Sequence, residues 1–536
     1  MVSAIDKSRT LISSLRELSG WRRGLLAFAG GIASAFAFPP YGAFPILWVT
    51  LPLLILLLDG ARDQTAARRK TRFFAFFRVS WAFFFGFFLI GLFWIAEAFL
   101  VDAKSYAWMI PFALVILPGG LALIPSLVLS GASLFWTHGV SRILLFVVAL
   151  ALSNWLRGHI LTGFPWNVWG YAFAENLTLM QSFSALGIYG VGFLVLFLFS
   201  MPVVLIDQRR KAAAAYISAC VLVWAGVVAY GTNRLQAPQQ TVEGLQVLVI
   251  QPNVPQADKW KPENRQRLLP LYLQQTQQAL SELKLDTETL IFWPESAFPF
   301  LLDEEPGALE AIGATLPQNT MLITGGIRRE LSENGNLFFN STFVVSDEGA
   351  LIDIYDKVRL VPFGEYLPKR WLLQSIGVER LVPAPADFTA GTRHKKIDLK
   401  NSLSFQPLIC YEAIFPQTVL PVSERPNLLV NLTNDGWFGE TAGPYQHLAQ
   451  ARVRAVEQGV PLVRAANTGI SSLVDSNGRI LAEVVLNKKG SFNSELPKIL
   501  RPTPYVRVGD SIFWGIILVV VSILLVMEKL LPTRRD

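Results

Sequence analysis

Three side chains that could act together on a carbonyl compound lie in the second half of the chain. Glu295 follows "LIFWP", Cys410 follows "PLI", and Lys357 lies within "YDKVRLVPFGEYLP". A thiol is a strong nucleophile once deprotonated, a carboxylate can accept that proton, and an ammonium can stabilise a thiolate or an oxyanion. Glu365, on the same loop as Lys357, could orient the ammonium. These residue types predict nucleophilic catalysis through a thioester.

No single one of these residues is specific evidence. Cysteine is often a buried structural residue, whereas glutamate and lysine in loops are usually solvated. Cys220 lies in an apolar segment and is interpreted as a packing residue. His447 begins a helical segment with no evident orienting partner, so a Cys–His pair is not favoured.

The region 231–508 has the pattern of an α/β layered domain. Amphipathic helices are predicted at 262–285 and 447–459, the second ending at Gly459. Strands alternate with them, and in α/β sheets chemistry gathers where strands end. This topology would bring Glu295, Lys357 and Cys410 to neighbouring strand ends. The predicted strands are 244–254, 288–298, 319–327, 338–347, 405–415 and 427–439.

The remainder of the chain is apolar enough for a membrane. Hydrophobic residues make up 52% of the sequence and charged residues 16%, against about 25% charged in soluble proteins. A span needs about 20 apolar residues. We predict eight spans, with seven or nine as alternatives, at 24–39, 43–58, 79–101, 106–136, 143–157, 178–206, 212–230 and 511–528.

Basic residues orient these spans. They cluster before span one, between spans two and three, four and five, and six and seven, and after span eight. With eight helices all these clusters lie on one side of the membrane, as the positive-inside rule requires. The net charge of +7 therefore indicates membrane topology and no nucleic-acid partner. The expected domains are an N-terminal cytoplasmic extension without assigned function (1–23), spans one to seven (24–230), an extracytoplasmic catalytic domain (231–508), and span eight with a cytoplasmic tail (509–536).

Metal and disulfide chemistry are not expected. The chain has two cysteines, too few for a disulfide framework, and four histidines with no close pair. We therefore predict no metal site and no cofactor.

Seven motifs together resemble the carbon–nitrogen hydrolase (nitrilase) superfamily. Within it, they resemble the branch whose members also carry a multi-span membrane domain and N-acylate lipoproteins. The resemblance extends from the first hairpin to the last span. The motifs are "FPPYG" (38–42), "GFPWN" (163–167), "QPNVPQADKW" (251–260), "WPES" (293–296), "YDKVRLVPFGEYLP" (355–368), "ICYE" (409–412) and "NDGWFG" (434–439).

The resemblance implies a fold and a set of roles. The fold would be an αββα nitrilase-like sandwich joined to an α-helical transmembrane bundle. Cys410 would be the acyl-accepting nucleophile, Glu295 the general base and Lys357 the oxyanion stabiliser. Supporting and substrate-binding positions around that centre would be Trp260, Glu365, Tyr411, Glu412 and, on the membrane side, Trp166.

The resemblance also implies a reaction and a location. A membrane phospholipid, phosphatidylethanolamine above all, would donate an acyl chain to the cysteine. The α-amino group of the S-diacylglyceryl cysteine of an apolipoprotein would then accept it. The enzyme would lie in the bacterial inner membrane with its catalytic domain in the periplasm.

Two other functions stay open. The same three residues would serve a membrane-anchored amidase or nitrilase that uses water as the acceptor. A transporter or receptor is disfavoured because the spans carry few charges.

The segment 369–388 mixes apolar and charged residues and is either a membrane-facing lid or ordinary core.

Overall fold

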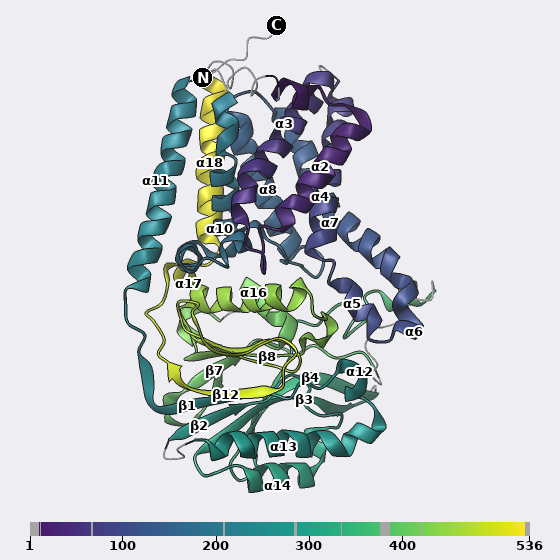
Figure 1. Ribbon diagram of the computed structural model, residues 1–536, viewed down its shortest axis with the longest axis vertical. Helices are drawn as coiled ribbons and strands as arrows, with labels where there is room; N and C mark the ends of the chain where they lie inside the picture. Colours follow the sequence, from purple (N-terminus) through teal and green to yellow (C-terminus); the bar gives the residue numbers. More distant parts are fainter. Residues whose placement is uncertain are drawn as a thin grey trace. The chain divides into compact units, whose positions relative to one another are not determined.

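The computed structural model describes residues 10, 12–65, 68–206, 210–283, 287–333, 335–375, 386–418 and 420–530. Residues 376–385 of the segment 369–388, and all but residue 10 of the N-terminal extension before residue 12, lie outside these residues. Contacts within the chain define two compact units (Figure 1). One comprises Met1–Phe93, Ile110–Arg234 and Val508–Asp536, and the other Trp94–Met109 and Leu235–Arg507.

The first unit is helical. Six helical segments among the described residues are long and apolar enough to cross a membrane, and Ser511–Met527 is a shorter apolar helix. The first and last predicted spans correspond to the two helices α2 and α18. The main helices are α2 (Gly20–Ala35), α3 (Leu47–Thr65), α4 (Arg69–Gly91), α7 (Ile110–Ala132), α8 (Val140–His159), α10 (Ser182–Phe199), α11 (Arg210–Leu235) and α18 (Ser511–Leu530).

The third predicted span, 79–101, had the wrong bounds. Helix α4 begins ten residues earlier, at Arg69, and ends at Gly91, because arginine and lysine are good helix formers and extend the helix beyond its apolar part. The following helix, α5 (Ile95–Leu100), groups with the second unit. There Trp94 Nε1 donates to Gln446 Oε1 at 3.2 Å, and its ring packs edge-on against Phe438 at 4.5 Å.

The second unit contains two six-stranded sheets, in the orders β12-β1-β2-β3-β4-β5 and β11-β10-β9-β8-β7-β6. Parallel pairs β1–β2, β2–β3, β7–β8 and β8–β9 form their centres. The strands are β1 (Thr241–Gln251), β2 (Glu288–Phe292), β3 (Thr320–Ser332), β4 (Gly335–Ser346), β5 (Leu351–Asp356), β6 (Ile397–Asp398), β7 (Ser404–Pro407), β8 (Leu428–Thr433), β9 (Leu462–Ala466), β10 (Ser471–Val474), β11 (Ile480–Val484) and β12 (Gly490–Pro497).

Helices cover the outer face of each sheet. Helices α13 (Arg265–Ser281) and α14 (Pro306–Thr315) pack on the first sheet, and α16 (Ala442–Gln458) packs on the second (Figure 1). The predicted αββα sandwich is thus confirmed. The prediction that helix α16 stops at Gly459 is also confirmed, since Gly459 has φ 65° and caps the helix in the left-handed conformation.

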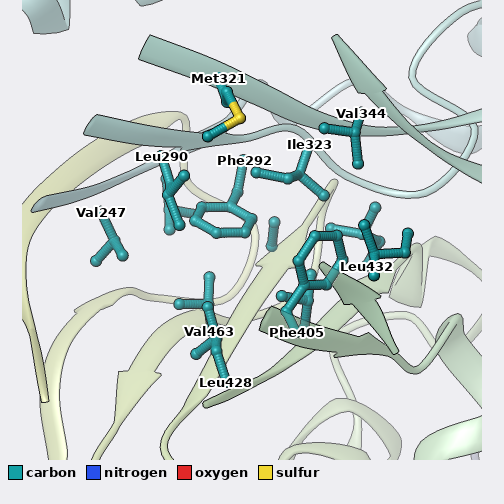
Figure 2. Packing of buried hydrophobic residues seen from close by; sticks show 14 of the residues in the cluster. Val247, Leu290, Phe292, Met321, Ile323, Val344, Phe405, Leu428, Leu432 and Val463 are labelled. Carbon is teal, nitrogen blue, oxygen red and sulfur yellow. The ribbon is translucent and has the colours of Figure 1, made fainter. Parts of the chain in front are cut away.

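The core lies between the two sheets. Alternate side chains of the central strands point inward and interdigitate (Figure 2), and full burial of each large apolar side chain contributes about 1.5–3 kcal/mol. The first sheet contributes Val247, Leu290, Phe292, Met321, Ile323 and Val344, and the second contributes Phe405, Leu428, Leu432 and Val463.

The predicted strand 405–415 is only partly correct. Strand β7 ends at Pro407, and a 3-10 turn, Cys410–Ile414, replaces the rest of it. Cys410 has φ 48°, which turns the chain out of the extended conformation. The turn is stabilised locally, because the Glu412 side chain accepts a hydrogen bond from the backbone N–H of Ile409 at 2.8 Å.

Candidate active site

Cys410 begins the turn that follows β7. Its backbone has φ 48°, in the left-handed region that non-glycine residues rarely occupy. Such a conformation persists only where the surroundings impose it. Leu408 N donates to Val430 O of β8 at 2.8 Å, fixing the entrance of the turn to the second sheet. The residue is 9% exposed, so it is buried from bulk solvent.

The first sheet contributes a buried cation held between two carboxylates. Lys357 Nζ donates to Glu365 Oε1 at 2.9 Å and lies 3.4 Å from Glu295 Oε1. Asn340 Nδ2 donates to the same two oxygen atoms, at 2.8 Å each. All four side chains are buried. The geometry holds the carboxylates together with one ammonium and one amide.

The elements explain how these groups meet. Glu295 follows β2, Lys357 follows β5, and Asn340 lies on β4 between them in the sheet. Lys357 N also donates to Asn340 O at 2.8 Å, which extends the ladder by one bond. Glu365 returns on the loop after Lys357, where Val361 N donates to its Oε2 at 2.7 Å. Strand ends far apart in sequence thus converge.

The buried surroundings raise the pKa values of both Lys357 and Cys410, for different reasons. Burial lowers the pKa of Lys357, but the carboxylates Glu365 and Glu295 outweigh burial and raise it overall, so the ammonium stays charged. Burial, and next the charge of Glu295, raise the pKa of Cys410 to about 12, while Lys357 opposes the rise. At neutral pH Cys410 is therefore a thiol, and a base is needed to activate it.

Glu412 joins the two sides of the site. Its Oε1 accepts from Tyr355 Oη at 2.9 Å and from the backbone N–H groups of Val358 and Arg359 at 2.8 and 3.1 Å. Its Oε2 accepts from Ile409 N at 2.8 Å. Burial raises the pKa of Glu412, and the three backbone hydrogen bonds and the charge of Lys357 oppose the rise. One carboxylate therefore joins the loop after Lys357 to the turn that begins at Cys410.

His447 has the partners that the sequence did not reveal. Its Nε2 donates to the backbone carbonyl of Cys410 at 3.0 Å, and its Nδ1 lies 2.9 Å from Asp435 Oδ1. Asp435 also pairs with Arg464 at 2.5 Å and accepts from Thr433 Oγ1 at 3.0 Å. The prediction that His447 lacks an orienting partner was wrong. Asp435 belongs to "NDGWFG", a motif that could have suggested the pairing.

His447 is expected to be required for stability. Replacing His447 by leucine removes the donor to a buried carbonyl, and this should lower the free energy of unfolding by about 1–3 kcal/mol. His447→Gln, which retains a donor, should cost less. Thermal unfolding of the purified protein measures both effects, with Tyr445→Leu on an exposed position of α16 as the control. An unchanged Tm for His447→Leu would contradict the role of His447 in stabilising the turn at Cys410.

Lys259 is a second buried lysine that the sequence analysis missed. It is 1% exposed, and its Nζ donates to the backbone carbonyl of Glu295 at 3.1 Å. Burial lowers its pKa to about 8, against the opposing charge of Glu295. Its neighbour Trp260 is partly exposed and ends the short helix α12 (Gln256–Lys259). The motif "QPNVPQADKW" thus contributes to the loop that supports the proposed base.

The other two predicted residues lie in different surroundings. Tyr411 is partly exposed, packs edge-on against Phe415 at 5.0 Å, and has its pKa raised by burial. Trp166 is buried in the helical unit, stacked on Phe164 at 5.9 Å. Within the described part of the chain, no cluster of three or more histidine, cysteine or acidic residues is placed to hold a metal ion.

The fold and this arrangement define a carbon–nitrogen hydrolase domain, and residues 247–497 match the model of the carbon–nitrogen hydrolase family. Residues 30–201 match the model of the apolipoprotein N-acyltransferase N-terminal domain.

Relatives that match along more than 90% of the chain identify one family within this class of proteins. The apolipoprotein N-acyltransferase of Rhodopseudomonas palustris is 40% identical over 96% of both chains. That of Bradyrhizobium diazoefficiens is 39% identical over 100% of this chain and 99% of the relative, and that of Brucella melitensis biotype 1 is 39% identical over 93% and 92%. The chain belongs to the apolipoprotein N-acyltransferase family. It is a multi-pass membrane protein and an acyltransferase.

Proposed function

We propose that the protein transfers a fatty acyl chain from a membrane phospholipid, through a thioester on Cys410, to the α-amino group of the S-diacylglyceryl cysteine of an apolipoprotein. The observation that carries this proposal is the buried Lys357 ammonium between Glu295 and Glu365, since Lys357 and Glu295 both act electrostatically on the Cys410 thiol. That set supplies a base, a nucleophile and a cation. The family supplies the class of acceptor.

In the first half-reaction Glu295 takes the thiol proton while Cys410 Sγ attacks the ester carbonyl of the phospholipid. The ammonium of Lys357 stabilises the oxyanion of the tetrahedral intermediate. The carbon–oxygen bond to glycerol then breaks, and Glu295 returns its proton to the leaving alkoxide. The products are a thioester on Cys410 and a lysophospholipid.

In the second half-reaction the free amine of the apolipoprotein attacks the thioester. Glu295 takes a proton from the attacking nitrogen, and the carbon–sulfur bond breaks. The departing thiolate recovers that proton, so the enzyme returns to its starting state. An amide bond replaces a thioester, which makes this step favourable.

A membrane location fits the substrates, since moving an acyl chain from lipid into water costs about 0.8 kcal/mol per CH₂ group. We place the protein in the bacterial inner membrane with the catalytic domain on the periplasmic side, as the distribution of basic residues indicates. We propose phosphatidylethanolamine as the donor. The amidase alternative differs only in using water as the second acceptor.

Mass spectrometry of the intact protein tests the proposal. After incubation with phosphatidylethanolamine, the wild type should gain one acyl chain on Cys410 and release lysophosphatidylethanolamine, whereas Cys410→Ala should gain nothing. Cys410→Ser should accept the acyl chain slowly and transfer it poorly, because an oxygen ester reacts less readily with amines. Absence of acyl mass on wild-type Cys410 would refute the thioester.

The same samples separate the two acceptors. Without apolipoprotein, an N-acyltransferase should retain its acyl group, and added diacylglyceryl peptide should discharge it. Rapid loss of the acyl group in the absence of an amine would favour the amidase instead.

A further inference from the structure

Arg359 places a guanidinium on the turn that carries the nucleophile. Its Cζ lies 4.6 Å from the ring centroid of Phe415, the residue that ends the turn Cys410–Ile414. The side chain of Arg359 is partly exposed, whereas the ring beneath it is buried. An arginine stacked in this way keeps its planar face on the ring and its N–H edge free to bind an anion.

The backbone of Arg359 is fixed next to the reacting groups. Its N–H donates to Glu412 Oε1 at 3.1 Å, and the other oxygen of that carboxylate accepts from Ile409 N at 2.8 Å. The main chain of Arg359 and the residue before Cys410 are therefore bridged by one carboxylate. Arg359 also follows Lys357 by only two positions.

The charge of Arg359 has no ion-pair partner in the part of the chain that the structure describes. Arg328 provides the contrast: its Cζ lies 4.4 Å from the Phe339 ring centroid, but Asp356 and Glu330 bind it at 2.8 and 2.9 Å. The positive charge of Arg359 instead acts on its neighbour Tyr411, where it opposes the rise in pKa that burial causes.

We propose that Arg359 binds the phosphodiester of the acyl donor and thereby makes the enzyme take its acyl chain from a phospholipid and not from a phosphate-free diacylglyceryl group. This inference rests on the proposed function. A guanidinium binds a phosphate through two parallel charge-assisted hydrogen bonds. Only the glycerol carbons separate the phosphate of a phospholipid from its ester, so one substrate can reach Arg359 and Cys410 together.

The proposal answers a problem that the two substrates pose. The apolipoprotein acceptor itself carries two acyl esters on its diacylglyceryl group, and attack on these would destroy the substrate. That group has no phosphate, so it gains nothing from Arg359. A cation stacked on the residue that ends the Cys410–Ile414 turn therefore separates donor from acceptor through a difference in affinity.

The test compares two donors with identical acyl chains, phosphatidylethanolamine and diacylglycerol, in the full-length protein with Cys220 replaced by alanine. The rate of acyl addition to Cys410 is followed by intact mass. Wild type should strongly prefer the phospholipid. Arg359→Gln should lower the kcat/KM for phosphatidylethanolamine about 10- to 100-fold, mainly through KM, and leave the diacylglycerol rate unchanged. Arg359→Lys should retain part of the preference.

Two controls show that the effect belongs to the phosphate. Arg265→Gln removes an exposed guanidinium on α13, paired with Glu305, and should change neither rate. The rate at which iodoacetamide alkylates Cys410 should stay within about twofold in Arg359→Gln, as expected if the site is still folded.

An unchanged ratio of the two donor rates in Arg359→Gln would overturn the proposal, as would a wild type without preference for the phospholipid. Excess inorganic phosphate should compete for the same guanidinium, so it should slow wild-type acylation from phosphatidylethanolamine but not from diacylglycerol. Inhibition by phosphate that persists in Arg359→Gln would overturn the assignment of the phosphate site to Arg359. If wild-type Cys410 gains no acyl chain from either donor, the proposed function fails first.

Discussion

Replacing Lys357 by methionine is expected to reduce acyl transfer about 10³-fold and to lower the free energy of unfolding by about 3–5 kcal/mol. The ammonium lies 2.9 Å from Glu365 and 3.4 Å from Glu295, and all three groups are buried. Removing it eliminates the proposed stabiliser of the oxyanion. It also leaves the carboxylates of Glu295 and Glu365 sharing the Asn340 side-chain amide without the ammonium between them, so the two negative charges repel each other.

The pH dependence of stability should show what the ammonium contributes against the repulsion between the two carboxylates. In the wild type the raised pKa of Lys357 means that its stabilisation is fully present below the ordinary lysine pKa of about 10.4 and is lost only as pH rises through the higher folded value. Lys357→Met lacks this contribution, so its deficit in Tm relative to the wild type should stay constant below about pH 10 and shrink as pH rises above it.

Two variants complete this experiment. The double variant Lys357→Met, Glu365→Gln should recover most of the lost stability but none of the activity, because the repulsion is gone while the cation is still missing. Lys395→Met removes a partly exposed partner of Asp353 at 2.8 Å, and should cost no more than about 1 kcal/mol. Equal losses of stability in the Lys395 and Lys357 variants would mean that the buried ion pairs of Lys357 contribute no more than a partly exposed one.

Replacing Glu295 by glutamine is expected to slow acyl transfer about 10²- to 10⁴-fold while making Cys410 more reactive toward iodoacetamide. Both effects follow from the same carboxylate. As the proposed base it accepts the thiol proton during catalysis. As a negative charge it raises the pKa of Cys410, second only to burial. Loss of the charge should lower the thiol pKa and enlarge the thiolate fraction at a given alkaline pH.

The measurement is the alkylation rate of Cys410 against pH, in protein with Cys220 replaced by alanine. In the wild type the rate should rise about tenfold per pH unit from pH 8 to 10 without a plateau, since the pKa is raised to about 12; an ordinary thiol levels off above about pH 8.5. The Glu295→Gln curve should shift to lower pH. Glu288→Gln, at the other end of β2, should leave it in place. A shift to higher pH in Glu295→Gln would contradict the assignment.

The sequence predicted the fold well where periodicity reflects burial. The apolar runs of β1, β2, β8 and their neighbours specify strands buried on both faces, so the αββα sandwich could be inferred. Boundaries were less accurate. Helix α4 extends into basic residues because these have good helix propensity, which a hydropathy pattern does not record. The strand before Cys410 ends at Pro407 because the chain then turns into the left-handed conformation at Cys410, which hydropathy does not predict either.

The amino-acid sequence by itself determined the residue types of the site and the class of chemistry: a thiol, a carboxylate and an ammonium, each at the end of an apolar run. Only the tertiary structure decided which groups hold them in place. His447 and Asp435 hold the backbone carbonyl of Cys410, Glu412 joins two loops, and Arg359 stacks on Phe415 with no carboxylate partner among the described residues. These partners come from different strands and helices, and hydrogen bonds and ion pairs between such distant segments leave no periodic signal in a sequence.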